Sequence, residues 1–378
     1  MAESLSEVPD VERCKVKKLL QKLLSRQQPC LTAIDIGSHT TKVMEIKRRK
    51  GLPYITALGS MPTPPLRDGV KLDEEELARV ISRLVETAGV TGTEVITAIS
   101  GSKVITRQIR VPVMPDAELQ KTAWAEAKKH IPLPIEDLTV RYVKLGEESV
   151  DGMTHINLML IAVPTALVEQ VYHIFMMAGL KIRAVDLQAF ALWRLFGKDQ
   201  RAATLDKGNA EAVAVLEIGA GNSQLVIIKG GEIKFVRVMA AGGNAVIEAI
   251  AGHYRISGEE ARQLTEETTT SFPARLQLDF YLRQGIDTLA REVERSLDFY
   301  CSQPGSVPVN NILLAGGTAK LTGLADYLTE RWGIVTEIKI PDCWNNYILN
   351  DQQEALFEYD PAYAVALGLL MGEVEEHV

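Results

Sequence analysis

Two similar stretches decide the fold: AIDIGSHTTKVMEI at residues 33–46 and VLEIGAGNSQLVII at residues 215–228. Each joins two apolar runs through a glycine-containing turn, which is the pattern of an antiparallel hairpin. Aligned end to end, the stretches share the glycine of the turn and an acid two residues before it. These pairs are Gly37 with Gly219 and Asp35 with Glu217. Chance similarity of two buried hairpins is the alternative, but a third strand and a helix follow each copy. The pattern therefore favours an internal duplication and two lobes of related fold.

The block between the two copies, about 75 residues long, belongs to neither and is large enough for its own core. Alternating patterns predict strands at 104–111, 138–145 and 156–162. Helical patterns cover residues 116–130 and 165–178. We therefore expect a small inserted α+β subdomain.

Composition indicates a folded protein with more than one domain. The chain has 378 residues, 46% hydrophobic and 24% charged, and is long for a single core. Its net charge of −8 argues against a nucleic-acid-binding protein, because such domains usually carry a basic surplus. Its four cysteines lie far apart with no CxxC motif, so we expect reduced thiols. The longest apolar stretch, 158–163, is far below the roughly 20 residues that span a bilayer. We expect a cytoplasmic protein.

A basic amphipathic helix is predicted at residues 11–26. Apolar side chains recur there at helical spacing, against a face of lysines and arginines. Such a helix can make peripheral contact with an anionic membrane or dock in a partner's groove. Packing against its own domain is the alternative.

The two hairpin turns have the composition of phosphate-binding loops. A phosphate chain needs several N–H donors and little side-chain bulk, and glycine supplies both. Gly37 with Ser38, and Gly219 with Gly221, are expected to grip phosphates from two sides. Lys42, on the strand after the first turn, is placed to reach back to a phosphate.

The paired acids point to a metal ion. Asp35 and Glu217 each lie at the end of the strand before a turn. Acids close to a polyphosphate repel it unless a cation intervenes, so Mg²⁺ held largely through water is predicted. A strand-end hydrogen bond is the alternative for either acid alone.

Two further glycine pairs each precede a predicted helix. They are Gly316 and Gly317, with Thr318 next in the chain, and Gly242 and Gly243. Helix N-termini favour anions, and bare glycine backbone lets a base or ribose approach. The motifs GxxxxGK[ST], GxGxxG, GxSxG and HExxH are absent from the sequence.

The order of these turns resembles that of the actin-like ATPase superfamily. DIGSHTTK (35–42) is similar to its first phosphate motif, EIGAG (217–221) to its second and LAGGT (314–318) to its adenosine motif. The inserted block resembles the one in the division protein FtsA. RVPVMPD (110–116) and the helix ending in HIPLPIE (130–136) resemble the PilM family of type IV pilus assembly, as does VDLQAFAL on the connecting helix.

The resemblance implies an α/β, actin-like, two-lobed duplicated fold with an FtsA-type α+β insertion subdomain. The implied units are a basic N-terminal segment at 1–30, subdomain 1A at 31–103, inserted subdomain 1C at 104–180, a return to 1A at 181–208, subdomain 2A at 209–245, subdomain 2B at 246–305, a return to 2A at 306–345, and a return helix to 1A at 346–378.

It also implies binding of ATP with Mg²⁺. The implied nucleotide-binding residues are Asp35, Gly37, Ser38, Lys42, Glu217, Gly219, Gly221, Gly242, Gly243, Gly316, Gly317 and Thr318, with Asp35 and Glu217 at the metal. Asp186 is the candidate to orient an attacking water, although a helix N-terminal cap explains it as well.

The implied partner is the short cytoplasmic peptide of the inner-membrane protein PilN, captured in a groove beside the insertion. Contacts with other pilus inner-membrane and motor components, at the inner face of that membrane, are implied too. No residue of the groove is marked by a motif.

Two departures from the family pattern favour slow hydrolysis or binding without turnover. Glu217 stands where Asp is usual, which moves the carboxylate relative to the metal. The helix that usually contains Ala-Glu-x-x-Lys has ARQLT at 261–265, without either polar anchor. A small-molecule kinase and a membrane-tethered, FtsA-like filament protein are the alternatives.

Overall fold

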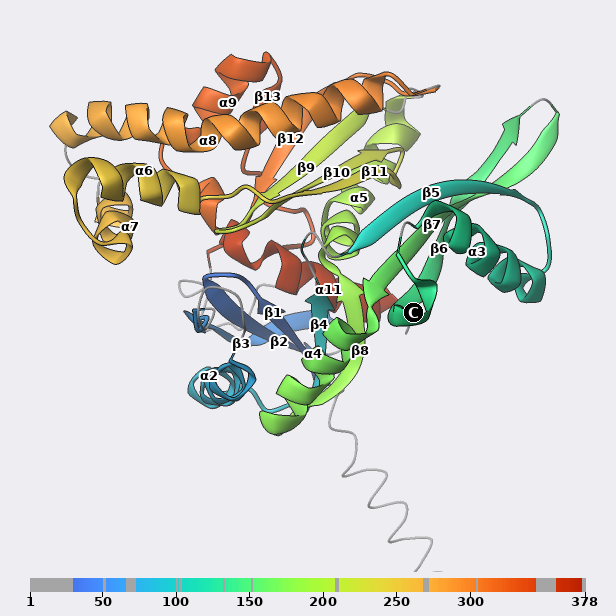
Figure 1. Ribbon diagram of the computed structural model, residues 1–378, viewed down its shortest axis with the longest axis horizontal. Helices are drawn as coiled ribbons and strands as arrows, with labels where there is room; N and C mark the ends of the chain where they lie inside the picture. Colours follow the sequence, from blue (N-terminus) through green and yellow to red (C-terminus); the bar gives the residue numbers. More distant parts are fainter. Residues whose placement is uncertain are drawn as a thin grey trace, which may run out of the picture.

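Two five-stranded sheets with the same strand order form the centres of the two lobes (Figure 1). The computed structural model describes residues 30–49, 52–65, 73–99, 101, 104–131, 133–150, 152–207, 211–267, 272–303, 305–344 and 358–375. The helix predicted at 11–26 lies outside this part of the chain. None of the described helices is long and apolar enough to cross a membrane.

The two sheets repeat each other strand by strand. The first has the order β3-β2-β1-β4-β8 and the second β11-β10-β9-β12-β13. Their strands are β1 (Leu31–Ile36), β2 (Thr40–Arg49), β3 (Leu52–Pro62), β4 (Glu94–Ile99) and β8 (Lys181–Leu187), then β9 (Ala212–Ile218), β10 (Ser223–Lys229), β11 (Glu232–Met239), β12 (Val309–Ala315) and β13 (Val335–Glu337). Asp35 pairs with Lys42 in the first hairpin, and Glu217 pairs with Gln224 at the matching position of the second. The predicted duplication is confirmed at the level of register.

Helices cover the sheets and join them. The first lobe has α2 (Glu74–Thr87), α4 (Thr165–Met177), α5 (Gln188–Lys207) and α11 (Ala364–Glu375), and the second has α6 (Asn244–Tyr254), α7 (Gly258–Glu267), α8 (Phe272–Cys301) and α9 (Leu324–Trp332). Short 3-10 turns lie at Ile135–Asp137, Gly317–Lys320 and Pro361–Tyr363.

One hydrophobic core spans both lobes. Met44 of β2 and Val226 of β10 belong to the same buried cluster, together with Phe196 of α5 and Leu367 of α11. Figure 1 shows α11 between the two sheets. The two lobes therefore cannot separate without exposing this core to water.

The inserted block is a three-stranded antiparallel sheet with one helix. It consists of β5 (Ile105–Pro112), α3 (Asp116–His130), β6 (Leu138–Val150) and β7 (Met153–Pro164), in the sheet order β5-β7-β6. Leu158 and Leu160 of β7 pack in one cluster with Leu119 of α3. Met159 and Ile161, on alternate positions of β7, join the core between the lobes, because successive side chains of a strand point to opposite faces.

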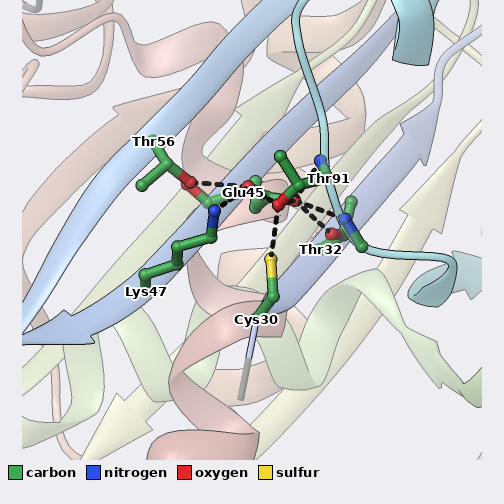
Figure 2. Close-up of polar contacts among 7 residues, drawn as sticks. Cys30, Thr32, Glu45, Lys47, Thr56 and Thr91 are labelled. Carbon is green, nitrogen blue, oxygen red and sulfur yellow. Dashed lines mark hydrogen bonds and ion pairs between the residues drawn. The ribbon is translucent and has the colours of Figure 1, made fainter. Parts of the chain in front are cut away.

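A buried carboxylate ties the first sheet to the loop before β4 (Figure 2). The side chain of Glu45 on β2 is fully buried. It accepts hydrogen bonds from the Thr56 hydroxyl at 2.7 Å and from the backbone amides of Thr91 and Gly92 at 2.8 Å each. The Lys47 ammonium lies 3.7 Å away. No local pattern in the sequence predicts this cluster.

Burial opposes the ionisation of Glu45, but these hydrogen bonds, with one from Cys30, outweigh it and hold the pKa of Glu45 at about 2. The thiol beside it behaves in the opposite way. Burial, followed by its contact with Glu45, raises the pKa of Cys30 to about 11. Glu45 is therefore charged and Cys30 neutral at physiological pH.

Replacement of Glu45 by glutamine should destabilise the protein by about 2–3 kcal/mol at neutral pH, because an amide group would then face the donors that the carboxylate satisfies. The pKa of Glu45 is depressed in the folded state, so its contribution is present above pH 4.5 and is lost as the pH falls through about 2. The difference from the parent in urea denaturation should shrink over that range. Glu94→Gln, at an exposed acid of the same sheet, is the control, and an equal loss in both variants would contradict the assignment.

Candidate functional site

The structure brings the turns of the two hairpins into contact. Each turn is closed by its own backbone, from the Gly37 amide to the Thr40 carbonyl at 3.2 Å and from the Gly219 amide to the Asn222 carbonyl at 3.0 Å. The Gly221 amide donates to Ser38 Oγ, from the other lobe, at 3.0 Å. The Gly221 amide and the Ser38 hydroxyl therefore join the two turns directly.

The first acid is held by residues from two other elements. Asp35 is only 4% exposed. Its Oδ1 accepts a hydrogen bond from Gln188 Nε2 at 3.0 Å, and its Oδ2 lies 3.5 Å from Lys42 Nζ. Gln188 is the first residue of α5. Its role was not predicted from the VDLQAFAL stretch, because nothing local in the sequence links it to Asp35.

The second acid lies in a crowded, half-buried position. Burial, followed by repulsion from Asp35, raises the pKa of Glu217 to about 8, and Lys42 opposes the shift. Gly316 lies directly against this side chain: a Cβ built on Gly316 would be 2.6 Å from Glu217 Oε1 and 2.4 Å from the Ile218 carbonyl. With its φ of 88°, only glycine suits position 316.

The second turn is held in place by contacts with Gly242, Gly243 and Thr318. The Gly219 carbonyl accepts hydrogen bonds from the Gly243 amide and from the Thr318 hydroxyl, both at 3.0 Å. A Cβ on Gly242 would come within 2.6 Å of the same carbonyl. Gly317 has open space around it, so a planar group could approach its backbone.

Asp186 lies on β8 rather than on the connecting helix, where the sequence analysis had placed it. Its carboxylate accepts a hydrogen bond from the Leu187 amide at 2.7 Å and forms an ion pair with Arg194 of α5. Gln188, two residues later, is the side chain that reaches Asp35.

Arg262 of α7 occupies the position at which the family usually has the glutamate of Ala-Glu-x-x-Lys. It has a structural role, since it donates a hydrogen bond to the Asn244 side chain of α6 at 3.3 Å.

The donor set fits Mg²⁺. Asp35 and Glu217 offer carboxylate oxygens, and Gln188 offers an amide oxygen beside them. No group of three or more His, Cys, Asp or Glu suited to a metal occurs among the described residues. Mg²⁺ commonly binds through one or two carboxylates, keeping water and substrate phosphates as its other ligands.

Comparison with known proteins agrees with this architecture. The family model of the type IV pilus assembly protein PilM matches residues 33–374. The chain belongs to the PilM family. A chain of the solved PilM–PilN type IV pilus biogenesis complex is 30% identical, with a TM-score of 0.77 over 91% of this chain and 98% of that one.

More distant relatives share the fold. FtsA of Streptococcus pneumoniae is 20% identical over 82% of this chain and 75% of its own length. The ethanolamine utilization protein EutJ of Carboxydothermus hydrogenoformans has a TM-score of 0.53 at 16% identity, covering 96% of this chain and 98% of that one. The expectation of an actin-like, two-lobed α/β fold with an extra antiparallel subdomain is confirmed for this PilM family member.

Replacement of Glu217 by glutamine should stabilise the ligand-free protein at alkaline pH. The pKa of Glu217 is raised in the folded state, so its contribution to stability is fully present below pH 4.5 and is lost as the pH rises through about 8. A neutral glutamine keeps that contribution, so its advantage in melting temperature should grow from pH 5 to pH 9. Glu211→Gln, at an exposed acid before β9, is the control. Parallel pH profiles for the parent and Glu217→Gln would contradict the prediction.

Proposed function

We propose that this PilM family member is an ATP-binding scaffold of type IV pilus assembly that captures the short cytoplasmic peptide of the inner-membrane protein PilN. The contact between Ser38 and Gly221 supports the nucleotide part most directly, because it joins two glycine turns beside two acids. The similarity to a chain of the PilM–PilN complex supports the partner.

In this proposal the backbone of both turns binds the phosphates and Lys42 supplies a positive charge. Asp35 and Glu217 hold Mg²⁺ largely through water, and the bound cation relieves their mutual repulsion. The phosphate-binding residues are Gly37, Ser38, Lys42, Gly219 and Gly221, with Gly242 and Gly243 close by and Gly316, Gly317 and Thr318 near the adenosine.

The site favours binding over turnover. The Asp186 carboxylate is already paired with Arg194, so it is not free to hold an attacking water. Gln188 lies against Asp35, and its amide can orient a water but cannot act as a base. We therefore propose hydrolysis that is at most slow, so that bound ATP stabilises one arrangement of the lobes.

The partner peptide is proposed to bind beside the inserted subdomain, at the cytoplasmic face of the inner membrane. That subdomain is joined to both lobes through β7, as the core between the lobes shows. A peptide bound there is therefore in contact with a rigid part of the scaffold. Further contacts with other pilus inner-membrane and motor components belong to the same proposal.

Lys42→Ala should weaken Mg·ATP binding roughly 10- to 100-fold, because a charge-assisted contact with a phosphate is lost and the charge of Asp35 is left without compensation. Isothermal titration calorimetry measures the affinity, and circular dichroism checks the fold. Lys181→Ala, at an exposed lysine on β8 of the same sheet, should bind as the parent does. Unchanged affinity in Lys42→Ala would remove this lysine from the site.

A synthetic peptide of the PilN N-terminus from the same genome should bind the full chain with 1:1 stoichiometry, and a scrambled peptide should not. Hydrogen–deuterium exchange should show protection within residues 105–164, because the inserted subdomain forms the proposed contact. Helices α6 and α7 of the second lobe serve as internal controls. Protection confined to those helices, or no binding, would contradict this part of the proposal.

A further inference from the structure

A groove separates the inserted subdomain from the second lobe, which lie side by side in Figure 1. A cavity of about 820 Å³ is lined by β5 on one side and β11 on the other, and a second cavity of about 360 Å³ adjoins it. The two cavities share residues 106–107, residues 235–236 and Phe299. We call this continuous space the β5–β11 groove.

Each wall of the groove includes the edge strand of a sheet, β5 beside residues of β6 and β7, and β11 beside residues of α8. Among the described strands, β5 pairs only with β7, and β11 pairs only with β10. An edge strand leaves one row of its backbone N–H and C=O groups without strand partners, and this row is a template for an added strand. Two such edges line one groove, so an extended peptide placed there can pair with backbone on either wall.

The charges of the groove favour an acidic occupant. Arg110 is paired with Glu148 at 3.4 Å, and Lys234 with Glu232 at 2.7 Å. Among the contacts of the described residues, Arg107 donates only to the carbonyl of the preceding residue, at 3.2 Å. Lys229 donates only to the Gly305 carbonyl, at 3.4 Å. A third acid, Glu147, also lines the groove and lies near Lys144, whose pKa it helps to raise. Two cations, one from each side, thus remain for a carboxylate.

An exposed aromatic ring provides an apolar contact at the same place. Phe299, near the end of α8, is 56% exposed and lies 5.9 Å from the ring of Phe235. Both rings line the two cavities. Large apolar side chains left exposed beside polar groups are typical of protein-binding surfaces.

We propose that the β5–β11 groove binds an extended segment of a partner protein by strand addition, with an acidic side chain between Arg107 and Lys229 and an apolar side chain against Phe299. The inference goes beyond the proposed function, since it depends neither on bound ATP nor on the identity of the PilN peptide.

The test uses a display library of random 12-residue peptides, selected on the full chain without nucleotide. Enriched peptides should carry Asp or Glu beside an apolar residue, and fluorescence anisotropy of labelled copies should give their affinity. Arg107→Glu and Phe299→Ala should each weaken binding at least tenfold. Melting curves confirm that both variants fold.

Two matched substitutions control for nonspecific effects. Arg141 of β6 is exposed and donates to its preceding carbonyl as Arg107 does, and Phe280 of α8 is exposed against Tyr281, but neither lines the groove. Arg141→Glu and Phe280→Ala should bind the peptides as the parent does.

The proposal is overturned if no peptide is enriched, if the enriched peptides are basic, or if Arg107→Glu and Phe299→Ala bind them unchanged. Self-association that is abolished by Phe299→Ala would also overturn it, since a second copy would then be the occupant.

Discussion

The close packing of α5 against α11 is the constraint on which the geometry of the site depends. A Cβ built on Gly368 of α11 would come within 2.1 Å of the Ala191 carbonyl of α5, so the helices touch backbone to backbone. Both helices belong to the core that also contains residues from each sheet. Densely packed interiors transmit strain and resist small displacements. This helix pair therefore helps to set the separation of the two hairpins, together with the contact between their turns.

This constraint explains how the turns can hold an unfavourable arrangement of charge. Asp35 and Glu217 would repel each other if both were ionised. Burial, followed by this repulsion, raises the pKa of Glu217. Lys42 and Gln188 stabilise Asp35, whereas Glu217 relies on protonation or on a cation. Functional sites commonly keep such strain because the surrounding fold stabilises it. Here the packing of the core between the lobes offsets the unfavourable free energy of placing these two acids close together.

Much of the fold follows from local patterns, because the periodicity of apolar residues records which face is buried. The helix expected at 116–130 is found as Asp116–His130, and the repeated hairpins have the expected register. Contacts between distant segments were not predictable in this way. Gln188 meets Asp35 because β8, which ends at the preceding residue, lies in the same sheet as β1. β5 lies across from β11 although the two strands are far apart in the sequence. Asp186 was misplaced because β8 continues to Leu187, where pairing with β4 overrides the helical pattern that follows.

The inserted subdomain packs against the core that lies beside the candidate nucleotide site. Alternate residues of β7 face α3 on one side and the core between the lobes on the other. That core includes Leu187 and Ala189, the neighbours of Gln188 in the chain. Packed interfaces tend to move between discrete arrangements instead of deforming continuously. Leu187 and Ala189 thus connect the contact between Gln188 and Asp35 to the core against which the inserted sheet packs.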